Sequence, residues 1–198
     1  MFNKIYIIGP VGSGKTTLLK ALCGILPHNG TCMLEQNLLE ALSAKQIARF
    51  HVFFETVGLK KGDKVALCAK NSARWGITFF AANTYEAVLV PILADFHPES
   101  VNSLVDHSES KVLLTDTDIW TKLDITKMPT IKAVISSSDF SLLYAADESI
   151  SEANKNIDEL FAQKYPDGYK ASNVSYPKDN DKNLAIINYT SGRTSAPK

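Results

Sequence analysis

Short apolar runs alternate with longer amphipathic stretches over the last two thirds of this chain, and that order constrains its fold most. The runs rich in β-branched residues predict strands at residues 64–68, 87–93, 111–115, 132–136 and 184–189. The stretches between them predict helices at residues 73–85, 98–107 and 152–164. Because parallel strands need crossover helices, we expect an α/β fold with three layers: a mainly parallel sheet with helices on both faces.

The first third of the chain predicts the same kinds of element. A strand is expected at residues 4–8, a helix at 15–26 and a further short strand at 31–34. Ser43 and Gln46 have the spacing of a capping box, so a helix is expected to open there and to end at Gly58.

The charge balance excludes some partners. The 21 Lys and Arg residues offset 21 Asp and Glu residues, so the formal net charge is zero and binding to nucleic acid is not expected. The apolar runs are too short to span a bilayer, and Met1 leads into a predicted strand rather than a signal peptide. Three cysteines without paired spacing suit a reducing compartment. These features indicate a cytoplasmic protein and leave its oligomeric state open.

A glycine-rich loop near the start has the pattern G-x-x-x-x-G-K-[ST], between a predicted strand and a predicted helix. In such a loop the glycines let backbone N–H groups approach phosphate oxygens, Lys15 reaches the β- and γ-phosphates, and Thr16 ligates Mg²⁺. The structural alternative is a glycine-rich turn that binds no ligand. The candidate residues for ATP in this first loop are Gly9, Gly12, Ser13, Gly14, Lys15, Thr16 and Thr17, with Thr16 the candidate metal ligand.

Residues 7–24 and 38–49 around this loop resemble the nucleotide-binding domain of ATP-binding cassette transporters. That family also uses a glutamine loop, an LSGGQ-type signature, an acidic Walker B strand and a switch histidine. The sequence has no LSGGQ-type segment, and the run from Val112 to Asp116 has the form of a Walker B strand, which is a common pattern. The resemblance therefore implies ATP binding without implying hydrolysis.

A second loop, rich in hydroxyl groups, ends the chain with the sequence YTSGRTSAPK at residues 189–198. From about residue 50 onward the chain resembles the N-terminal part of adenylate-forming enzymes of the AMP-binding superfamily, especially bacterial long-chain fatty acid–CoA ligases. The resemblance includes VGLKKGDKVAL at residues 57–67, DHSESK at 106–111 and AIINYTSG at 185–192. The family form of the last motif is YTSGTTG-x-PKG, which holds ATP phosphates. This implies phosphate contacts from Thr190, Ser191, Gly192, Thr194, Ser195 and Lys198.

The second loop departs from the family motif. Arg193 replaces the usual threonine, so a hydroxyl is lost and a large side chain enters a tight loop, and Ser195 stands where glycine is common. Glu86 likewise replaces a glycine common in the family. The structural alternative is a terminal tail that binds nothing. Because the first loop keeps its whole motif, we expect nucleotide binding to centre there.

We interpret the chain as a mosaic of a P-loop unit at residues 1–49 and a truncated adenylate-forming unit at residues 50–198. The family's adenine-binding segments and catalytic C-terminal domain would follow Lys198, so the resemblance implies an incomplete active site and no catalytic residue is assigned. The expected function is ATP or AMP binding by a fragment of acyl-CoA ligase type, with a fatty acid as the implied further partner; any activity would be that of a ligase. The alternatives are a P-loop NTPase-like binding or regulatory module, and a protein without small-molecule activity.

The histidines and tryptophans have simpler interpretations. The four histidines have no carboxylate or cysteine at metal-ligand spacing, so neither a catalytic nor a metal role is expected for His28, His51, His97 or His107. Trp75 and Trp120 are expected to be packing residues.

Overall fold

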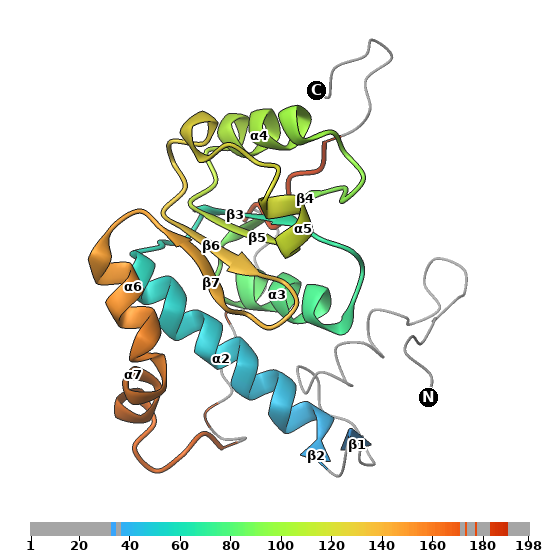
Figure 1. The fold of residues 1–198 in the computed structure, drawn as a ribbon. Helices are drawn as coiled ribbons and strands as arrows, with labels where there is room; N and C mark the ends of the chain where they lie inside the picture. Colours follow the sequence, from blue (N-terminus) through green and yellow to red (C-terminus); the bar gives the residue numbers. More distant parts are fainter. Residues whose placement is uncertain (1–32, 35–36, 171–172, 174–176, 178–182, 190–198) are drawn as a thin grey trace, which may run out of the picture.

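A computed structural model describes residues 33–34, 37–170, 173, 177 and 183–189 of the chain. Its centre is a five-stranded sheet of order β4-β3-β5-β6-β7 (Figure 1). Within this sheet β3, β4, β5 and β6 are mutually parallel, and β7 is an antiparallel edge strand. The strands are β3 (Lys64–Cys68), β4 (Val88–Ile92), β5 (Val112–Thr115), β6 (Ala133–Ser136) and β7 (Leu142–Ala145).

Helices cover both faces of this sheet. The helices α2 (Leu39–Val57), α3 (Ala73–Thr84) and α6 (Glu148–Lys155) pack on one face, and α7 (Ile157–Lys164) packs against α2. On the other face lie α4 (Pro98–His107), α5 (Thr117–Trp120) and the 3-10 turn η1 (Ile125–Lys127). The predicted three-layer α/β fold with a mainly parallel sheet is therefore confirmed.

The helix ends explain where the elements begin and stop. α3 follows Ser72, whose hydroxyl accepts a hydrogen bond from Trp75 N at 3.1 Å, and α4 starts with Pro98, which has no N–H to leave unpaired. The residues that end α2, α3 and α4 have positive φ: 72° at Gly58, 61° at Glu86 and 54° at Glu109. Only glycine adopts such a conformation without strain, so both glutamates sit in an unfavourable backbone geometry.

The strand predicted at residues 184–189, which we call the edge segment, is a single parallel bridge between Ile186 and Leu89. Leu89 N donates to Ala185 O at 3.0 Å, and Ile187 N donates to Leu89 O at 2.9 Å. The next residue of β4 that faces the edge segment is Pro91, which has no N–H to continue the ladder. The prediction of a full strand was wrong because this proline ends the pairing.

The structure also corrects several helix and strand boundaries. The helix predicted at residues 152–164 is two helices separated by Asn156, and α6 starts before residue 152 because Asp147 accepts a hydrogen bond from Ile150 N at 3.1 Å. α2 begins at Leu39, so Ser43 lies inside the helix; residues 39–42 are themselves good helix formers. β7 was not predicted. Near the predicted strand at residues 31–34, β1 (Met33–Leu34) pairs antiparallel with β2 (Asn37–Leu38).

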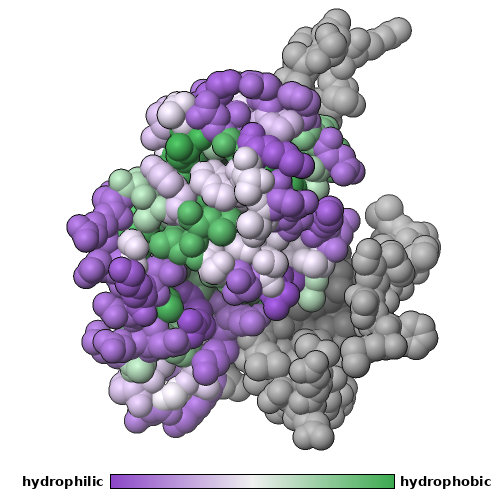
Figure 2. All heavy atoms as spheres, in the orientation of Figure 1, coloured by the Kyte–Doolittle hydropathy of each residue, from purple (hydrophilic) through white to green (hydrophobic). Residues whose placement is uncertain are grey.

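The face of the protein seen in Figure 2 is mainly hydrophilic, with hydrophobic residues gathered over β6 and β7. This agrees with the position of β7, an edge strand whose residues are all half-buried. Within the described residues, no helix combines the length and the apolar character that crossing a membrane requires.

Candidate nucleotide site

The residues predicted to contact nucleotide lie outside the described part of the chain, both in the first loop (residues 9–17) and in the second (residues 190–198). The structure does describe Tyr189, the residue directly before Thr190, and the edge of the sheet along which the edge segment runs. We therefore describe the parts of the sheet that lie closest in sequence or topology to the two loops.

The carboxyl ends of β3 and β5 mark the point where the chain connections diverge. After β3 the chain reaches β4 through α3 on one face, and after β4 it crosses back to β5 through α4 on the other. In open α/β sheets, ligands bind outside the carboxyl ends of the strands at such a point. The loops after Cys68 and Thr115 thus occupy the position at which this class of fold binds ligands.

Asp116 lies at this point, directly after β5. Its Oδ2 accepts a hydrogen bond from Lys70 N at 3.0 Å, and its Oδ1 accepts one from the Ser137 hydroxyl. The carboxylate therefore joins the loops that follow β3, β5 and β6. This is the acid that the sequence allows as a Walker B residue, and both of its oxygens are engaged by the protein. Among the described residues, no group of three or more His, Cys, Asp or Glu could hold a metal ion.

Small polar side chains end three neighbouring strands: Cys68, Thr115 and Ser136 pair in register across the sheet. Burial, followed by the charge of Asp116, raises the pKa of the Cys68 thiol to about 12. The thiol is therefore protonated at neutral pH and is not a nucleophile. Thr115 Oγ1 is buried and has no hydrogen-bond partner in the part of the chain that is described.

Two of the histidines stabilise helices. His51 Nε2 in α2 lies 2.9 Å from Thr84 Oγ1 and 3.2 Å from Ala81 O. Burial lowers the pKa of His51, so its ring is neutral at pH 7 and joins α2 to α3. His97 precedes α4 and accepts a hydrogen bond from Glu99 N at 3.4 Å.

A third histidine contacts the residue that leads into the second loop. His107 Nδ1 lies 2.8 Å from the Tyr189 hydroxyl, and the two rings meet edge to face with centroids 5.7 Å apart. Burial raises the pKa of Tyr189, so its hydroxyl keeps its proton at neutral pH. Sequence reasoning missed this pair because the two residues belong to separate elements and no local pattern links them.

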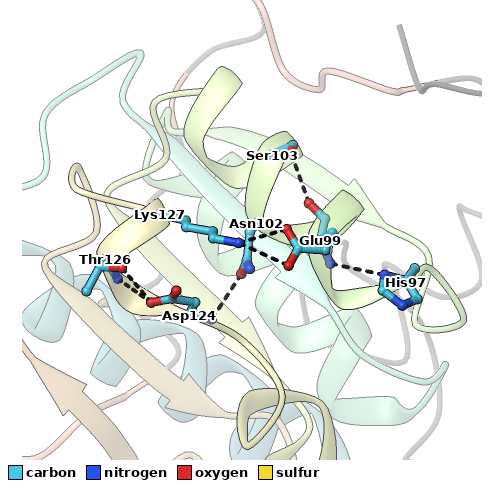
Figure 3. A network of polar contacts seen from close by, with 7 residues as sticks. All are labelled: His97, Glu99, Asn102, Ser103, Asp124, Thr126 and Lys127. Atoms are coloured by element: carbon cyan, nitrogen blue, oxygen red, sulfur yellow. Dashed lines mark hydrogen bonds and ion pairs between the residues drawn. The ribbon is translucent and has the colours of Figure 1, made fainter.

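A polar network fixes the amino end of α4 to η1 (Figure 3). Lys127 Nζ binds both carboxylate oxygens of Glu99, at 3.0 and 2.9 Å, and Asn102 Oδ1 accepts a hydrogen bond from Asp124 N at 3.3 Å. These contacts hold α4, the helix that carries His107, against the connection between β5 and β6.

A hollow of about 370 Å³ lies between α2, the turn after β6 and the α6–α7 pair. Phe50 and Phe140 meet there edge to face with ring centroids 4.7 Å apart, and the Arg49 guanidinium forms an ion pair with Asp158 beside it. Sequence analysis did not predict this hollow because four separate segments line it. The lining residues are Lys45, Gln46, Arg49, Phe50, Phe53, Ile135, Asp139, Phe140, Asn154 and Ile157.

The fold and the diverging strand connections define a doubly wound α/β protein, a class that binds ligands at the carboxyl ends of its strands. The chain belongs to the AMP-binding enzyme family, whose model matches residues 43–198. The ABC transporter model matches residues 2–66, so the two matches overlap in α2 and β3. The predicted resemblance to both families is confirmed.

Individual relatives likewise match either a short part of the chain or most of it. The chain is 48% identical over 51 residues to the vitamin B12 import ATP-binding protein BtuD of Photorhabdus laumondii, covering 26% of this chain and 20% of that protein. It is 25% identical over 142 residues to fatty acyl-CoA synthetase A of Dictyostelium discoideum, covering 72% of this chain and 21% of that protein. It is 28% identical over 141 residues to the putative acyl-CoA ligase YdaB of Bacillus subtilis, covering 71% of this chain and 25% of that protein. The chain thus spans a quarter or less of the length of these relatives.

Solved structures show the same fold. The anthranilate CoA ligase AuaEII in complex with anthranoyl-AMP superimposes with a TM-score of 0.66 at 14% identity, over 90% of this chain and 33% of that one. The N-terminal domain of FACL13 from Mycobacterium tuberculosis gives a TM-score of 0.55 at 24% identity, over 80% of this chain and 35% of that one.

Proposed function

We propose that this chain binds ATP or AMP as a catalytically incomplete fragment of the acyl-CoA ligase type. The observation that carries the proposal is the AMP-binding enzyme match over residues 43–198, combined with an edge segment that runs beside β4 directly into the second loop. The hydroxyl and amide groups of that loop suit phosphate oxygens. The name of the relative fatty acyl-CoA synthetase A supports a fatty acid as the further partner. We also propose a cytoplasmic location.

The first loop is the stronger phosphate site in this proposal. The ABC transporter match at residues 2–66 supports an ATP cradle in which Lys15 reaches the phosphates. Thr16 would supply one protein ligand to Mg²⁺, which commonly keeps few protein ligands and takes the rest from phosphate and water. The two units at residues 1–49 and 50–198 then have different origins, and each contributes one loop.

Catalytic incompleteness is supported by the chemistry of the described side chains. Asp116 is engaged by Lys70 and Ser137, the Cys68 thiol has a pKa of about 12, and His51 is held between two helices. These three side chains are engaged in contacts within the protein or stay protonated. Adenylation requires groups that bind the phosphates and the metal to be held together around the reacting atoms.

Titration with ATP and AMP tests the proposal. Lys15→Ala should weaken ATP binding by roughly 10- to 100-fold, because a charge-assisted hydrogen bond to phosphate contributes about 1.5–3 kcal/mol. Ser191→Ala should change the affinity much less, and Lys122→Ala, at an exposed position of the described surface, should not change it. If Ser191→Ala abolishes binding and Lys15→Ala does not, the second loop is the main site.

Two further outcomes decide between the alternatives. Release of pyrophosphate from ATP with fatty acids of several lengths should stay at background; turnover near an ordinary enzyme rate of ~10 s⁻¹ would refute catalytic incompleteness. ATP binding that depends on Lys15, with no response to AMP, would favour the P-loop NTPase-like module. The absence of binding at millimolar ATP would favour a protein without small-molecule activity.

A further inference from the structure

The hollow between α2, the turn after β6 and the α6–α7 pair lies beside the carboxyl end of a parallel strand (Figure 1). Ile135 is the last residue but one of β6, and Asp139 and Phe140 belong to the turn that follows this strand. Folds of this class bind ligands outside the carboxyl ends of their strands. The volume of about 370 Å³ falls within the range of small-molecule sites, roughly 300–1,000 Å³.

The apolar part of the lining is largely aromatic. Phe50, Phe53 and Ile135 are buried, with exposed fractions of 6%, 4% and 2%. Phe140 meets Phe50 edge to face, with ring centroids 4.7 Å apart. Aromatic rings prefer offset-stacked or edge-to-face contacts with one another, so this lining favours a ligand that carries a flat ring.

Phe140 is held in an unfavourable backbone conformation at this position. Its φ is 63°, which a bulky side chain rarely adopts. Hydrogen bonds from Phe140 N to Ser136 O at 3.0 Å and from Ser136 N to Ser141 O at 2.8 Å close the turn that imposes this conformation. Strained residues concentrate at ligand sites, where the surrounding structure holds them in place. The turn thus fixes an aromatic ring in the lining of the hollow.

The two cations of the lining differ in their partners. Lys45 and Arg49 are neighbours one turn apart on α2, and Arg49 forms an ion pair with Asp158. Lys45 forms no ion pair within the described part of the chain, and its Nζ lies 5.9 Å from the centroid of the Phe161 ring. One ammonium group therefore remains for a ligand, and its single charge suits a carboxylate better than a phosphate dianion.

The other polar groups of the lining are compatible with a carboxylate. Asp139 Oδ1 accepts hydrogen bonds from Ser141 N at 3.0 Å and from the Ser141 hydroxyl at 2.7 Å, and the positive charge of Arg74 offsets the charge of Asp139. The side-chain amides of Gln46 and Asn154 form no hydrogen bond with any described residue. Each amide keeps N–H donors with which to bind a ligand oxygen.

We propose that this hollow binds an aromatic carboxylate, with its ring among Phe50, Phe53 and Phe140 and its carboxylate group at Lys45. The inference goes beyond the proposed function, because it requires neither of the phosphate loops and no nucleotide.

Binding of 2-naphthoate to the full chain, without nucleotide, tests this proposal. For a ligand of this size we expect one site per chain with a dissociation constant of about 0.1–1 mM. Changes in the backbone amide NMR signals locate the site: they should be largest in α2, in the turn after β6 and in α6 and α7, and small in α4. Changes that are largest in α4, or no saturable binding at about 10 mM ligand, would overturn the proposal.

A change of one lysine tests the position of the carboxylate. Lys45→Met keeps the apolar stem of an exposed side chain and removes its charge, so the fold should be retained. It should weaken the binding of 2-naphthoate about 2- to 5-fold, as expected for an ion pair that water reaches. Uncharged 2-naphthamide should bind to the wild type and to Lys45→Met equally. The matched control is Lys122→Met, at an exposed position that follows α5, which should change neither affinity. Equal losses for the carboxylate and the amide would overturn the proposal.

Decanoate, an aliphatic carboxylate of similar size, tests the aromatic contacts. It should bind several-fold more weakly than 2-naphthoate, and Phe140→Leu should weaken the binding of 2-naphthoate more than that of decanoate. Tighter binding of decanoate than of 2-naphthoate would overturn the proposal. Lys15→Ala should leave the affinity for 2-naphthoate unchanged whatever it does to ATP binding, so this proposal and the nucleotide proposal fail or stand separately.

Discussion

Replacing Asp63 by Asn tests how the amino ends of the parallel strands are held together. Asp63 precedes β3, and its Oδ2 accepts hydrogen bonds from Lys60 N and from Lys111 Nζ, each at 2.7 Å. Its backbone carbonyl accepts a hydrogen bond from Val88 N at 2.8 Å, so the same residue contacts the starts of β3, β4 and β5. The Asp63 side chain is 19% exposed and that of Lys111 is 31% exposed.

These exposures set the magnitude of the effect. A hydrogen bond to a charged group contributes about 1.5–3 kcal/mol when shielded and less when water reaches it, so we expect Asp63→Asn to cost about 1–2 kcal/mol at pH 7. Asparagine keeps an oxygen that can accept from Lys60 N. Most of the loss should therefore come from the ion pair with Lys111.

The pH dependence follows from the pKa of Asp63. Burial raises this pKa, but the hydrogen bonds from Lys111 and Lys60 and the charges of Lys111 and Lys132 outweigh burial, so the net pKa is lowered. A carboxyl group whose pKa is lower in the folded state stabilises the fold above its unfolded pKa, about 3.9, and loses that contribution as the pH falls through the folded pKa. The difference between wild type and Asp63→Asn should therefore be complete at pH 7 and shrink below about pH 4.

Urea unfolding of the wild type, Asp63→Asn, Lys111→Met and the double variant measures the coupling. We expect a coupling free energy of about 1–2 kcal/mol at pH 7 that declines in acid. The control cycle uses Glu99 and Lys127, whose side chains are 64% and 49% exposed, and its coupling should be much smaller. Additive effects of Asp63→Asn and Lys111→Met at pH 7, or a coupling that persists unchanged in acid, would refute the reasoning.

Other substitutions test the helix ends and the core, each by the urea midpoint at pH 7. Gly58→Ala should cost about 1 kcal/mol, because φ is 72° there and the added Cβ would meet nothing closer than Lys132 Nζ at 3.8 Å, so strain alone acts. Glu86→Gly should stabilise the protein by about 0.5–1 kcal/mol, since relief of a φ of 61° exceeds the loss of a partly exposed ion pair; a lower midpoint would contradict this. Ser72→Ala should cost about 1 kcal/mol by removing the cap on Trp75 N. Phe54→Ala should cost about 3–5 kcal/mol, as Phe54 is fully buried, and a loss below about 1 kcal/mol would show that the site collapses.

The sequence was sufficient to predict the central sheet because its strands are buried on both faces. β3, β5 and β6 read as continuous apolar runs, and continuous runs are what a parallel sheet with helices on both sides requires. The starts of α3 and α4 could also be predicted, because Ser72 and Pro98 act within their own helical turn.

The edges of the sheet could not be predicted in the same way. β7 is four residues long and half-buried, and its apolar run contains no β-branched residue, so the sequence does not separate it from a segment of a helix. The edge segment does read as an apolar run, but its pairing is limited by Pro91 on a different strand. The break at Asn156, between α6 and α7, has no glycine or proline to indicate it, and α7 packs against α2 through Phe161.

In the candidate site, too, local motifs could be predicted from the sequence, whereas contacts between distant segments could not. The phosphate loops are predicted from local motifs, in which a few consecutive residues carry all the chemistry, and they remain predictions. Asp116 and the His107–Tyr189 pair depend on which strands become neighbours, since Asp116 joins three loops and Tyr189 contacts a helix far from it in sequence. Such contacts follow from the topology, so sequence patterns cannot indicate them.

The overlap of the two family matches has a physical counterpart in α2. Ile47 and Phe54 belong to the same core cluster as the strands of the sheet, and Ala48 packs against Phe161 of α7. The helix is continuous from Leu39 to Val57, so it passes through the proposed division at residues 49 and 50. The backbone hydrogen bonds of a helix link each residue to the fourth one before it, and the two halves of α2 therefore cannot open independently without breaking them. The proposed division at that point concerns the origin of the two parts of the chain, whereas the core of the fold reaches back at least to Ala44, which is buried. In the proposed division, the boundary between the two units thus falls inside a helix that packs in the core of the sheet, and not in a linker.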